Sequence, residues 1–333
     1  MNSRTAIKLR ALGVIASTIT CTVIGAHNAT AADNREDYPA RPIRMVVPFP
    51  AGGPTDISAR ILAQKLTEGW TRQVVVDNRG GANGIIGQDA AAKANPDGYT
   101  ILVQSVAFAV NPSLYTLPYD SEKDFLPVTL VAATPLMLVI NPGVPAHSVK
   151  ELVALAKAKP SQLNYASFGN GSIAHLAGEL LKTSAGITMT HVAYKGVPQS
   201  ISDVVSGQCQ VMFPTIPSAL PFTKSNRLRG LAVTSPQRSP LSPELPTMPE
   251  AGVRGYEAST WFGVFFPAGV AQPILSKLHA ELLRIMAQPD VKAQFDSQGF
   301  TLQPMKPDEF RRFIRAETDK YARVVKAAGV KVE

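Results

Sequence analysis

The sequence predicts an α/β fold in which a parallel or mixed sheet is covered by helices. From residue 41 onward, short apolar runs alternate with longer segments whose apolar residues recur every three or four positions. Runs of about five apolar residues are typical of buried strands, and the longer periodic segments are typical of helices that pack on a sheet. The length of 333 residues is ordinary for two domains, and an apolar fraction of 45% is enough for a substantial core.

The predicted strands are short apolar segments bounded by turn residues. For example, Asn141-Pro142-Gly143 ends one of them. They lie at 43–47, 73–76, 99–103, 136–140, 163–166, 188–192, 229–233 and 257–266.

The predicted helices lie between these strands and at the C-terminal end of the chain. Ser148 followed by Glu151 is a capping-box pattern, which marks the start of one helix. The helices are predicted at 55–66, 84–93, 148–158, 171–184, 198–206, 273–287, 289–298 and 307–328. A proline-rich segment at 235–252 is predicted to be a surface loop, because proline cannot continue a helix or a central strand.

The first 31 residues are predicted to be a cleaved secretory signal peptide. Arg4, Lys8 and Arg10 precede an uncharged, mostly apolar stretch at 11–26, and Ala29-Thr30-Ala31 matches a cleavage signal. A membrane anchor is the alternative, but several threonines and glycines make the stretch only weakly hydrophobic. Cleavage after Ala31 would lower the formal net charge of +8 by the three basic residues, to +5. Such a peptide predicts a secreted protein.

The remaining positive charge suits anionic small ligands rather than nucleic acid. Lysines and arginines are scattered, and no run of them is longer than Arg311-Arg312. After cleavage one cysteine, Cys209, would remain, so the fold would contain no intrachain disulfide. Cys209 lies in the segment at 207–213 (GQCQVMF), where a strand is predicted to begin, and this position favours a small buried structural thiol over a nucleophile.

A glycine-rich turn at 48–56 joins the first predicted strand to the first predicted helix. Gly52 and Gly53 leave backbone N–H groups accessible, Thr55 is the expected N-cap, and Asp56 falls in the first helical turn. A helix N-terminus of this kind attracts carboxylate or phosphate groups. The turn lacks the lysine of a P-loop and the spacing of a dinucleotide-binding fingerprint. An ordinary strand-to-helix turn is the alternative.

A second turn of the same construction lies at 165–176. Gly169 and Gly171 free the backbone, and Ser167 and Ser172 add hydroxyl donors. His175 follows one turn into the predicted helix, where a histidine is more often structural than a ligand contact. Because both turns follow short apolar strands, where open α/β sheets bind ligands, they suit a ligand with two anionic ends.

A third segment follows the predicted strand at 99–103. Gln104 and Ser105 place polar groups at the strand end, and Phe108 would supply an apolar wall unless it packs in the core.

Signatures of common enzyme and metal sites are missing from the sequence. It contains neither a G-x-S-x-G nucleophile elbow nor an H-E-x-x-H motif. The four histidines after the signal peptide are not spaced like metal ligands. A Ser-His-Asp triad stays open, because its members need not be close in sequence. We expect no metal and no cofactor.

Eight motifs resemble the Bug family of periplasmic solute-binding proteins, which are also called tripartite tricarboxylate transporter receptors. The resemblance covers nearly all of the chain after the signal peptide, and eight motifs in one order are specific. The motifs are YPARPIRMVVPFPAGGPTD at 38–56, VDNRGGANG at 76–84, PDGYT at 96–100, NPSLY at 111–115, the turn at 165–176, YKG at 194–196, LPTMPEAG at 245–252 and WFG at 261–263.

The resemblance implies a two-lobed type II periplasmic-binding-protein fold. Each lobe would be a mixed sheet flanked by helices, and the lobes would close on the ligand by a hinge motion. Lobe 1 would comprise 38–133 plus 258–333, and lobe 2 would comprise 134–257. Two crossing strands, near 134–140 and 257–266, would form the hinge.

The resemblance further implies that both turns hold carboxylates through backbone N–H groups, hydroxyls and bridging water. The implied contacts are Phe49, Ala51, Gly52, Gly53, Thr55 and Asp56 in lobe 1, and Ser167, Gly169, Gly171 and Ser172 in lobe 2. The chain departs from many relatives at Phe108, where a polar residue is common, and at Phe168, where a small residue or proline is common. These aromatic residues lead to the hypothesis of an aromatic ligand body, since stacking contributes about 0.5–1.5 kcal/mol beyond burial.

We therefore expect a monomeric periplasmic binding protein, without enzyme activity, for a small organic carboxylate. The ligand would be a dicarboxylate with an aliphatic or aromatic body. The partners would be subunits of a tripartite tricarboxylate-type membrane transporter, or a sensor protein. Two alternatives stay open: a periplasmic enzyme that acts on small carboxylic acids, and a scaffold protein that binds no small ligand and that no carboxylate would stabilise.

Overall fold

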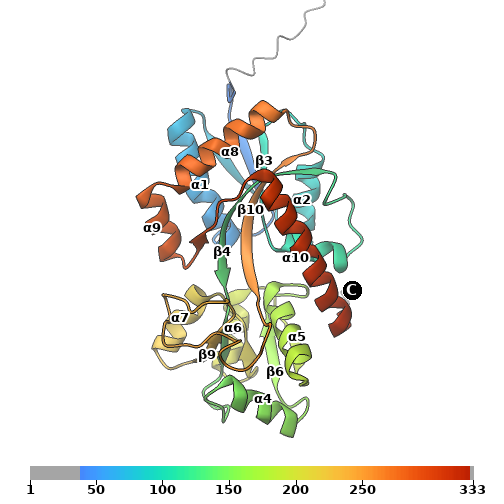
Figure 1. The fold of residues 1–333 in the computed structure, drawn as a ribbon, viewed down its shortest axis with the longest axis vertical. Helices are drawn as coiled ribbons and strands as arrows, with labels where there is room; N and C mark the ends of the chain where they lie inside the picture. The colour runs from blue at the N-terminus through green and yellow to red at the C-terminus, as the bar shows by residue number, and fades with distance from the viewer. Residues whose placement is uncertain (1–37, 331–333) are drawn as a thin grey trace, which may run out of the picture. The chain divides into compact units, whose positions relative to one another are not determined.

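The computed structural model describes residues 38–330, which form two β-sheets flanked by helices (Figure 1). The predicted signal peptide and its cleavage site lie outside these residues. Within residues 38–330, no helix is both long enough and apolar enough to span a bilayer.

The first sheet has six strands in the order β11-β4-β10-β3-β1-β2. Their bounds are β1 Ile43–Val47, β2 Val74–Asn78, β3 Thr100–Ser105, β4 Phe125–Pro135, β10 Ser259–Pro267 and β11 Thr301–Leu302. β1 pairs in parallel with β2 and β3, whereas β10 runs antiparallel to β3 and β4. The helices associated with this sheet are α1 Pro54–Trp70, α2 Ile85–Ala92, α3 Ala107–Val110, α8 Gln272–Met286, α9 Pro289–Ser297 and α10 Pro307–Ala328.

The second sheet has five strands in the order β7-β6-β8-β5-β9. Their bounds are β5 Met137–Ile140, β6 Asn164–Ser167, β7 Thr190–Ala193, β8 Val211–Met212 and β9 Arg229–Val233. β6 pairs in parallel with β7 and β8, and β5 runs antiparallel to β8 and β9. The helices are α4 Val149–Ala158, α5 Ile173–Ala185, α6 Val197–Val205 and α7 Ile216–Lys224.

Two neighbouring chain segments connect the sheets, and Thr234 joins them. Leu136 alone separates β4 of the first sheet from β5 of the second, and its N–H donates to the Thr234 hydroxyl at 2.7 Å. The Thr234 hydroxyl in turn contacts the carbonyl of Ala258, the residue before β10, at 2.5 Å. Thr234 is fully buried. These segments coincide with the two predicted crossings, and their role as a hinge stays a prediction.

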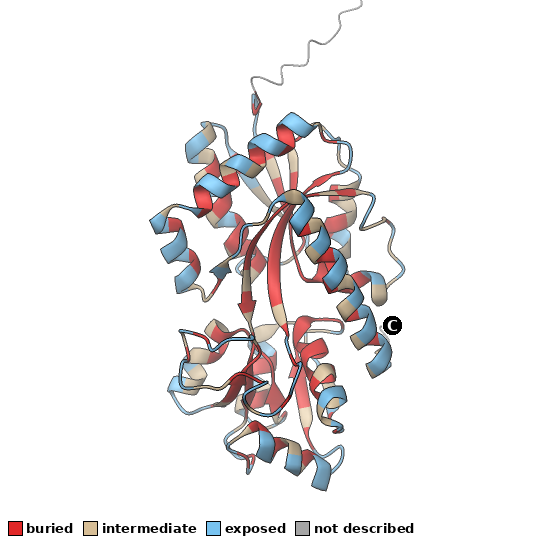
Figure 2. Ribbon diagram, viewed as in Figure 1, coloured by how far each residue is buried: buried red, intermediate tan, exposed pale blue. Residues whose placement is uncertain are grey.

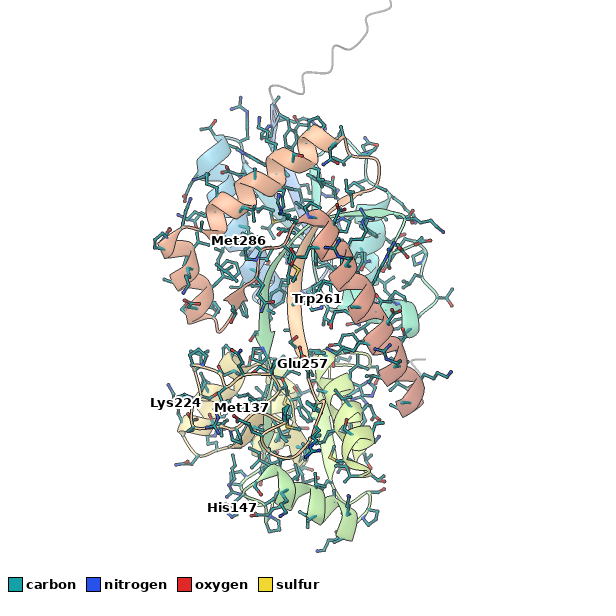
Figure 3. All side chains as sticks on the ribbon, viewed as in Figure 1. Met137, His147, Lys224, Glu257, Trp261 and Met286 are labelled. Atoms are coloured by element: carbon teal, nitrogen blue, oxygen red, sulfur yellow. The ribbon has the colours of Figure 1, made fainter. Side chains whose placement is uncertain are left out.

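The central strands of both sheets are buried, the edge strands β2, β7 and β11 are partly exposed, and the outer faces of the helices are exposed (Figure 2). One apolar cluster contains residues of both sheets, including Leu138 of β5 and Phe265 of β10. Trp261 on β10 (Figure 3) is fully buried and donates its indole N–H to Glu317 of α10 at 3.0 Å. This contact fixes α10 on the first sheet, and α10 also contacts α5 beside the second sheet (Figure 1).

All predicted strands and helices occur, with ends that differ by a few residues. The capping box is present, since the Glu151 N–H donates to the Ser148 hydroxyl at 3.2 Å. The strand predicted to begin within 207–213 occurs as β8. The prediction missed β4 and α7, which contain two prolines each, and it missed the short elements α3 and β11. The segment at 235–252 contains no helix or strand, as predicted, but it is not wholly a surface loop, because Ser242 and Met248 are fully buried.

Candidate functional site

The first glycine-rich turn leads from β1 directly into α1. Gly53 is the N-cap, and Pro54 occupies the first helical position, which corrects the expectation that Thr55 is the cap. The Ile57 N–H bonds to the Gly53 carbonyl at 2.9 Å and is the first intrahelical donor. Pro54 has no N–H, so the N–H groups of Thr55 and Asp56 are the free donors that a helix N-terminus provides.

The buried carboxylate of Asp56 forms hydrogen bonds that stabilise this turn. Its carboxylate is 1% exposed and accepts the Gly52 N–H, the Asn78 amide and the Arg60 guanidinium, each at 2.8 Å. Burial acts to raise the pKa of Asp56, but the hydrogen bonds from Arg60, Gly52 and Asn78 and the charge of Arg60 outweigh it, so that the pKa lies below its ordinary value. Asp56 therefore faces the turn, and the Gly52 N–H is used within it.

Phe49 and Gln104 lie together beside Gly84. A Cβ atom built on Gly84 would lie 3.2 Å from the Phe49 ring and 3.0 Å from the Gln104 amide nitrogen. Gln104 is fully buried, donates to Gln88 at 2.9 Å and accepts the Ser105 N–H at 2.7 Å. Ala51 and Gly52 are exposed at the tip of the turn, while Phe49 is half-buried. Except for Phe108, the predicted residues of the first lobe thus lie around one turn.

The second glycine-rich turn leads from β6 into α5 in the same way. Ser172 is the N-cap and accepts the His175 N–H at 3.4 Å. Gly169 and Gly171 have φ angles of +135° and +71°, a region that side chains rarely adopt. Ser167 is fully buried, and its hydroxyl contacts the Gly169 carbonyl at 3.0 Å. The predicted residues of the second lobe are therefore also adjacent in the structure.

Two stacked histidines form hydrogen bonds with residues of this second turn. The rings of His175 and His191 are parallel within 3°, with centroids 3.7 Å apart. His175 Nδ1 accepts the Gly171 N–H at 3.1 Å, and His191 Nε2 lies 2.7 Å from the Ser167 hydroxyl. Burial lowers the pKa of both histidines to about 4, aided at His191 by the charge of His175. Both imidazoles are therefore neutral at neutral pH, which supports the structural interpretation of His175.

The second turn contacts first-lobe residues that the sequence analysis did not single out. A Cβ atom built on Gly171 would lie 2.6 Å from Leu114 Cδ1 and 3.6 Å from both the Asn83 amide and the Tyr115 hydroxyl. Asn83 is itself held by Asn111 through two hydrogen bonds, at 2.8 and 3.1 Å. The signal was present, because these residues belong to the motifs at 76–84 and 111–115.

The two aromatic residues proposed to contact a ligand lie in different surroundings. Phe108 is 2% exposed and stacks on Phe265, with a centroid distance of 4.3 Å and an interplanar angle of 10°. Its placement in the core corrects the expectation of an apolar wall beside the turns. Phe168 is half-buried and packs against the apolar core. The structure therefore removes Phe108 from the argument for an aromatic ligand.

A pocket of about 920 Å³ lies elsewhere, between the segment at 117–127 and α10. Phe108 is the one predicted site residue in its lining, which also carries the carboxylates of Asp120, Glu122, Asp124 and Asp319. These four carboxylates outnumber the two guanidinium groups of the lining, Arg311 and Arg315, so the pocket is poorly suited to an anionic ligand. Within residues 38–330, no three metal-ligating side chains are grouped to hold a metal ion. The two glycine-rich turns are therefore the candidate site.

Comparison with known proteins agrees with this architecture. The sequence pattern of the tripartite tricarboxylate transporter family receptors matches residues 58–330. The solved structure of the periplasmic binding protein BugD is 34% identical, with a TM-score of 0.78, over 89% of this chain and 100% of that one. These findings confirm the resemblance and the two-lobed fold.

Two similar structures were solved with carboxylates. Rpa4515 from R. palustris, described with adipate, is 33% identical over 88% of this chain and 99% of its own, with a TM-score of 0.81. MatC from Rhodopseudomonas palustris, described with bound malate, is 29% identical over 86% of this chain and 100% of its own, with a TM-score of 0.77.

Proposed function

Since the chain belongs to the tripartite tricarboxylate transporter family of receptors, we propose that it is a non-enzymatic periplasmic protein that binds a small dicarboxylate between its two glycine-rich turns. The observation that carries this proposal is the likeness of the turns. Each joins a parallel strand to the N-terminus of a long helix, and each contains a glycine with positive φ. Helix N-termini attract carboxylates through free N–H groups and the helix dipole.

The proposed ligand is a dicarboxylate of malate or adipate size. The similar proteins with adipate and malate support this class, and the core position of Phe108 weakens the case for an aromatic body. We propose that the ligand contacts the turns at 49–56 and 167–172. Phe49 and Phe168 are the aromatic residues that we propose to contact it. The bound protein would deliver its ligand to transporter subunits in the membrane, or present it to a sensor.

Isothermal titration calorimetry with adipate, malate, phthalate and acetate tests this proposal. We expect adipate or malate to bind and to raise the melting temperature, since a ligand that binds only the folded state stabilises it. Acetate, with one carboxylate, should bind far more weakly. Failure of every dicarboxylate would favour the scaffold alternative, and binding of phthalate alone would restore the aromatic hypothesis.

A pair of serine variants tests the location of the site. Ser172 and Ser148 are both N-caps of second-lobe helices, and each accepts the N–H of the residue three positions on. Serine-to-alanine substitution at either cap should cost about 1 kcal/mol of stability. Only Ser172→Ala should also weaken dicarboxylate binding. Equal affinities of the two variants would contradict the proposed site.

A hydrolase is the second candidate, because Ser167 and His191 lie at hydrogen-bonding distance like a nucleophile and its base. The complete burial of Ser167 and its contact with the Gly169 carbonyl argue against it. Incubation of the protein with a dicarboxylate monoester, followed by mass spectrometry, decides between the two. If hydrolysis product forms with the natural chain and not with Ser167→Ala, the protein is a hydrolase and the proposed binding function is wrong.

A further inference from the structure

The first turn contains a chain of three residues spaced four apart. Gly52, with φ of +80°, donates its N–H to the Asp56 carboxylate at 2.8 Å. Asp56 in turn accepts from Arg60, one helical turn further along α1, at 2.8 Å. Residues four apart on a helix lie on the same face, so the carboxylate is held between the turn and the guanidinium. The glycine conformation is thereby fixed by an acceptor from the first turn of its own helix.

The second turn repeats this chain with different chemistry. Gly171, with φ of +71°, donates its N–H to His175 Nδ1 at 3.1 Å. His175 Nε2 lies 4.0 Å from the carboxylate of Glu179, again four residues further along the helix. An imidazole nitrogen thus occupies the place of the Asp56 carboxylate, and an acid occupies the place of Arg60.

We propose that His175 is a positioning residue of the second turn: its unprotonated Nδ1 holds the Gly171 N–H and thereby sets the backbone geometry that receives the ligand. This inference rests on the proposed function and adds a residue that orders the site without touching the ligand. It also makes the second turn sensitive to protonation, because an imidazole that carries a proton on Nδ1 has no lone pair to accept the Gly171 N–H.

The hydrogen bonds assign the tautomers of both histidines. His175 accepts at Nδ1, so its proton is on Nε2, which faces Glu179. The Ser167 hydroxyl has three contacts: the Gly169 carbonyl, the Gly169 N–H and His191 Nε2. All three are satisfied together when Ser167 donates to the carbonyl and His191 donates from Nε2. His191 thus supports the turn as a donor, while His175 supports it as an acceptor.

The charged and titratable neighbours of the histidine pair come from two elements, β6 and α5. Tyr165 of β6 packs against both imidazole rings, with centroids 6.3 Å from His175 and 4.9 Å from His191. On α5 itself, Lys182 binds the Glu179 carboxylate at 2.7 Å. Burial and the charge of Lys182 lower the pKa of His175 to about 4. The acceptor is therefore retained through neutral pH and lost in acid.

Two variants at this position separate the acceptor from the imidazole. His175→Asn offers an amide oxygen near the place of Nδ1 and does not titrate, whereas His175→Leu has similar bulk and no acceptor. His147→Asn is the control, because His147 is exposed at the start of α4 (Figure 3). Exchange of the Gly171 amide with solvent, measured by NMR at neutral pH, requires no ligand. We expect protection in the natural chain and in His175→Asn, and exchange about tenfold faster in His175→Leu.

Calorimetry with adipate and malate measures the consequence for binding. We expect His175→Leu to lose about tenfold in affinity and His175→Asn to stay near the natural chain. On acidification from neutral pH to about pH 3.5, which lies below the His175 pKa of about 4, the affinity of the natural chain and of His147→Asn should fall more than that of His175→Asn. If His175→Leu does not fold, the acid dependence of affinity in the natural chain, compared with that in His175→Asn, still tests the role of His175.

The outcomes separate this inference from the proposed function. If neither adipate nor malate binds the natural chain, the proposed dicarboxylate function fails, and the amide exchange still tests His175. If dicarboxylates bind while His175→Leu keeps both Gly171 protection and affinity, the inference is wrong and the function stands. Identical acid profiles of the natural chain and His175→Asn would also overturn it.

Discussion

At the residue scale, the buried charge of Asp56 stabilises the backbone of a loop by accepting a hydrogen bond from it. Its carboxylate is balanced by Arg60, which is itself about half exposed, and by two neutral donors. Removing this buried carboxylate leaves the Gly52 N–H, the half-buried Asn78 amide and the Arg60 guanidinium without their acceptor, and losing hydrogen bonds to a charged group is costly.

We therefore predict that Asp56→Ala lowers the free energy of unfolding by about 2–3 kcal/mol. Asp308→Ala is the matched control, because Asp308 lies in the first turn of α10 but is exposed. Urea denaturation at neutral pH measures both. Because the pKa of Asp56 lies below its ordinary value, the loss should shrink as pH falls through the folded pKa. Equal losses in the two variants would contradict the role of Asp56.

Gly171 is the second informative residue, because space and conformation both restrict it. A Cβ at this position would lie 2.6 Å from Leu114 Cδ1, whereas one at Gly186, with φ of +61°, would meet nothing within 4 Å. Alanine at either glycine should cost about 1 kcal/mol or more for the left-handed conformation. We predict that only Gly171→Ala also weakens dicarboxylate binding, as calorimetry would measure. Unchanged affinity in Gly171→Ala would show that the contact with Leu114 does not matter for binding.

At the scale of elements, α5 is fitted to β6 by a glycine inside the helix. A Cβ on Gly178 would overlap the ring of Tyr165, which is fully buried. Alanine normally favours a helix over glycine by about 1 kcal/mol, but here it would force a buried ring to move. Gly69 in α1 offers a contrast, because a Cβ there would meet the end of the Glu281 side chain.

We predict that Gly178→Ala destabilises the protein by about 1–3 kcal/mol despite its better helix propensity. Gly69→Ala should be neutral or slightly stabilising, because a side-chain end can move at little cost. Thermal or urea unfolding of both variants measures the difference. A stabilised Gly178→Ala would mean that α5 can shift on the sheet.

Elements with a clean local pattern were predictable, and elements governed by pairing were not. Ile43–Val47, Arg229–Val233 and Pro307–Ala328 occur with the predicted bounds, because a run of apolar residues or a helical period specifies each one locally. β4 contains Pro127 and Pro135, and its strand conformation depends on its pairing with β10. No local signal carries that pairing, so the prediction missed it.

At the scale of the whole molecule, the stacked histidines link stability to pH. Unfolding would restore the ordinary histidine pKa of about 6.5, whereas burial lowers the pKa of both to about 4 in the folded protein. Between these values the unfolded chain binds more protons, so the free energy of unfolding should fall as pH decreases. Each histidine should contribute a slope of up to about 1.4 kcal/mol per pH unit.

Urea denaturation at several pH values between about 6.5 and 4 measures this slope. His175→Asn should flatten it, because one of the two titrating groups is gone. His147→Asn should leave it unchanged, since His147 is exposed. A profile that does not differ between the natural chain and His175→Asn would mean that His175 is not held neutral by the fold.

The sequence by itself determined the α/β class, the order of most elements, the family, and the two glycine-rich turns as the candidate site. These features depend on local periodicity, on turn chemistry and on motifs in a fixed order, all of which lie within short stretches of chain. The tertiary structure decided which atoms face which. It turned Asp56 and the Gly52 N–H toward each other, placed Phe108 in the core, and brought His191 of β7 onto His175 of α5. Packing between segments distant in sequence decides such contacts, because a side chain's direction depends on what covers it.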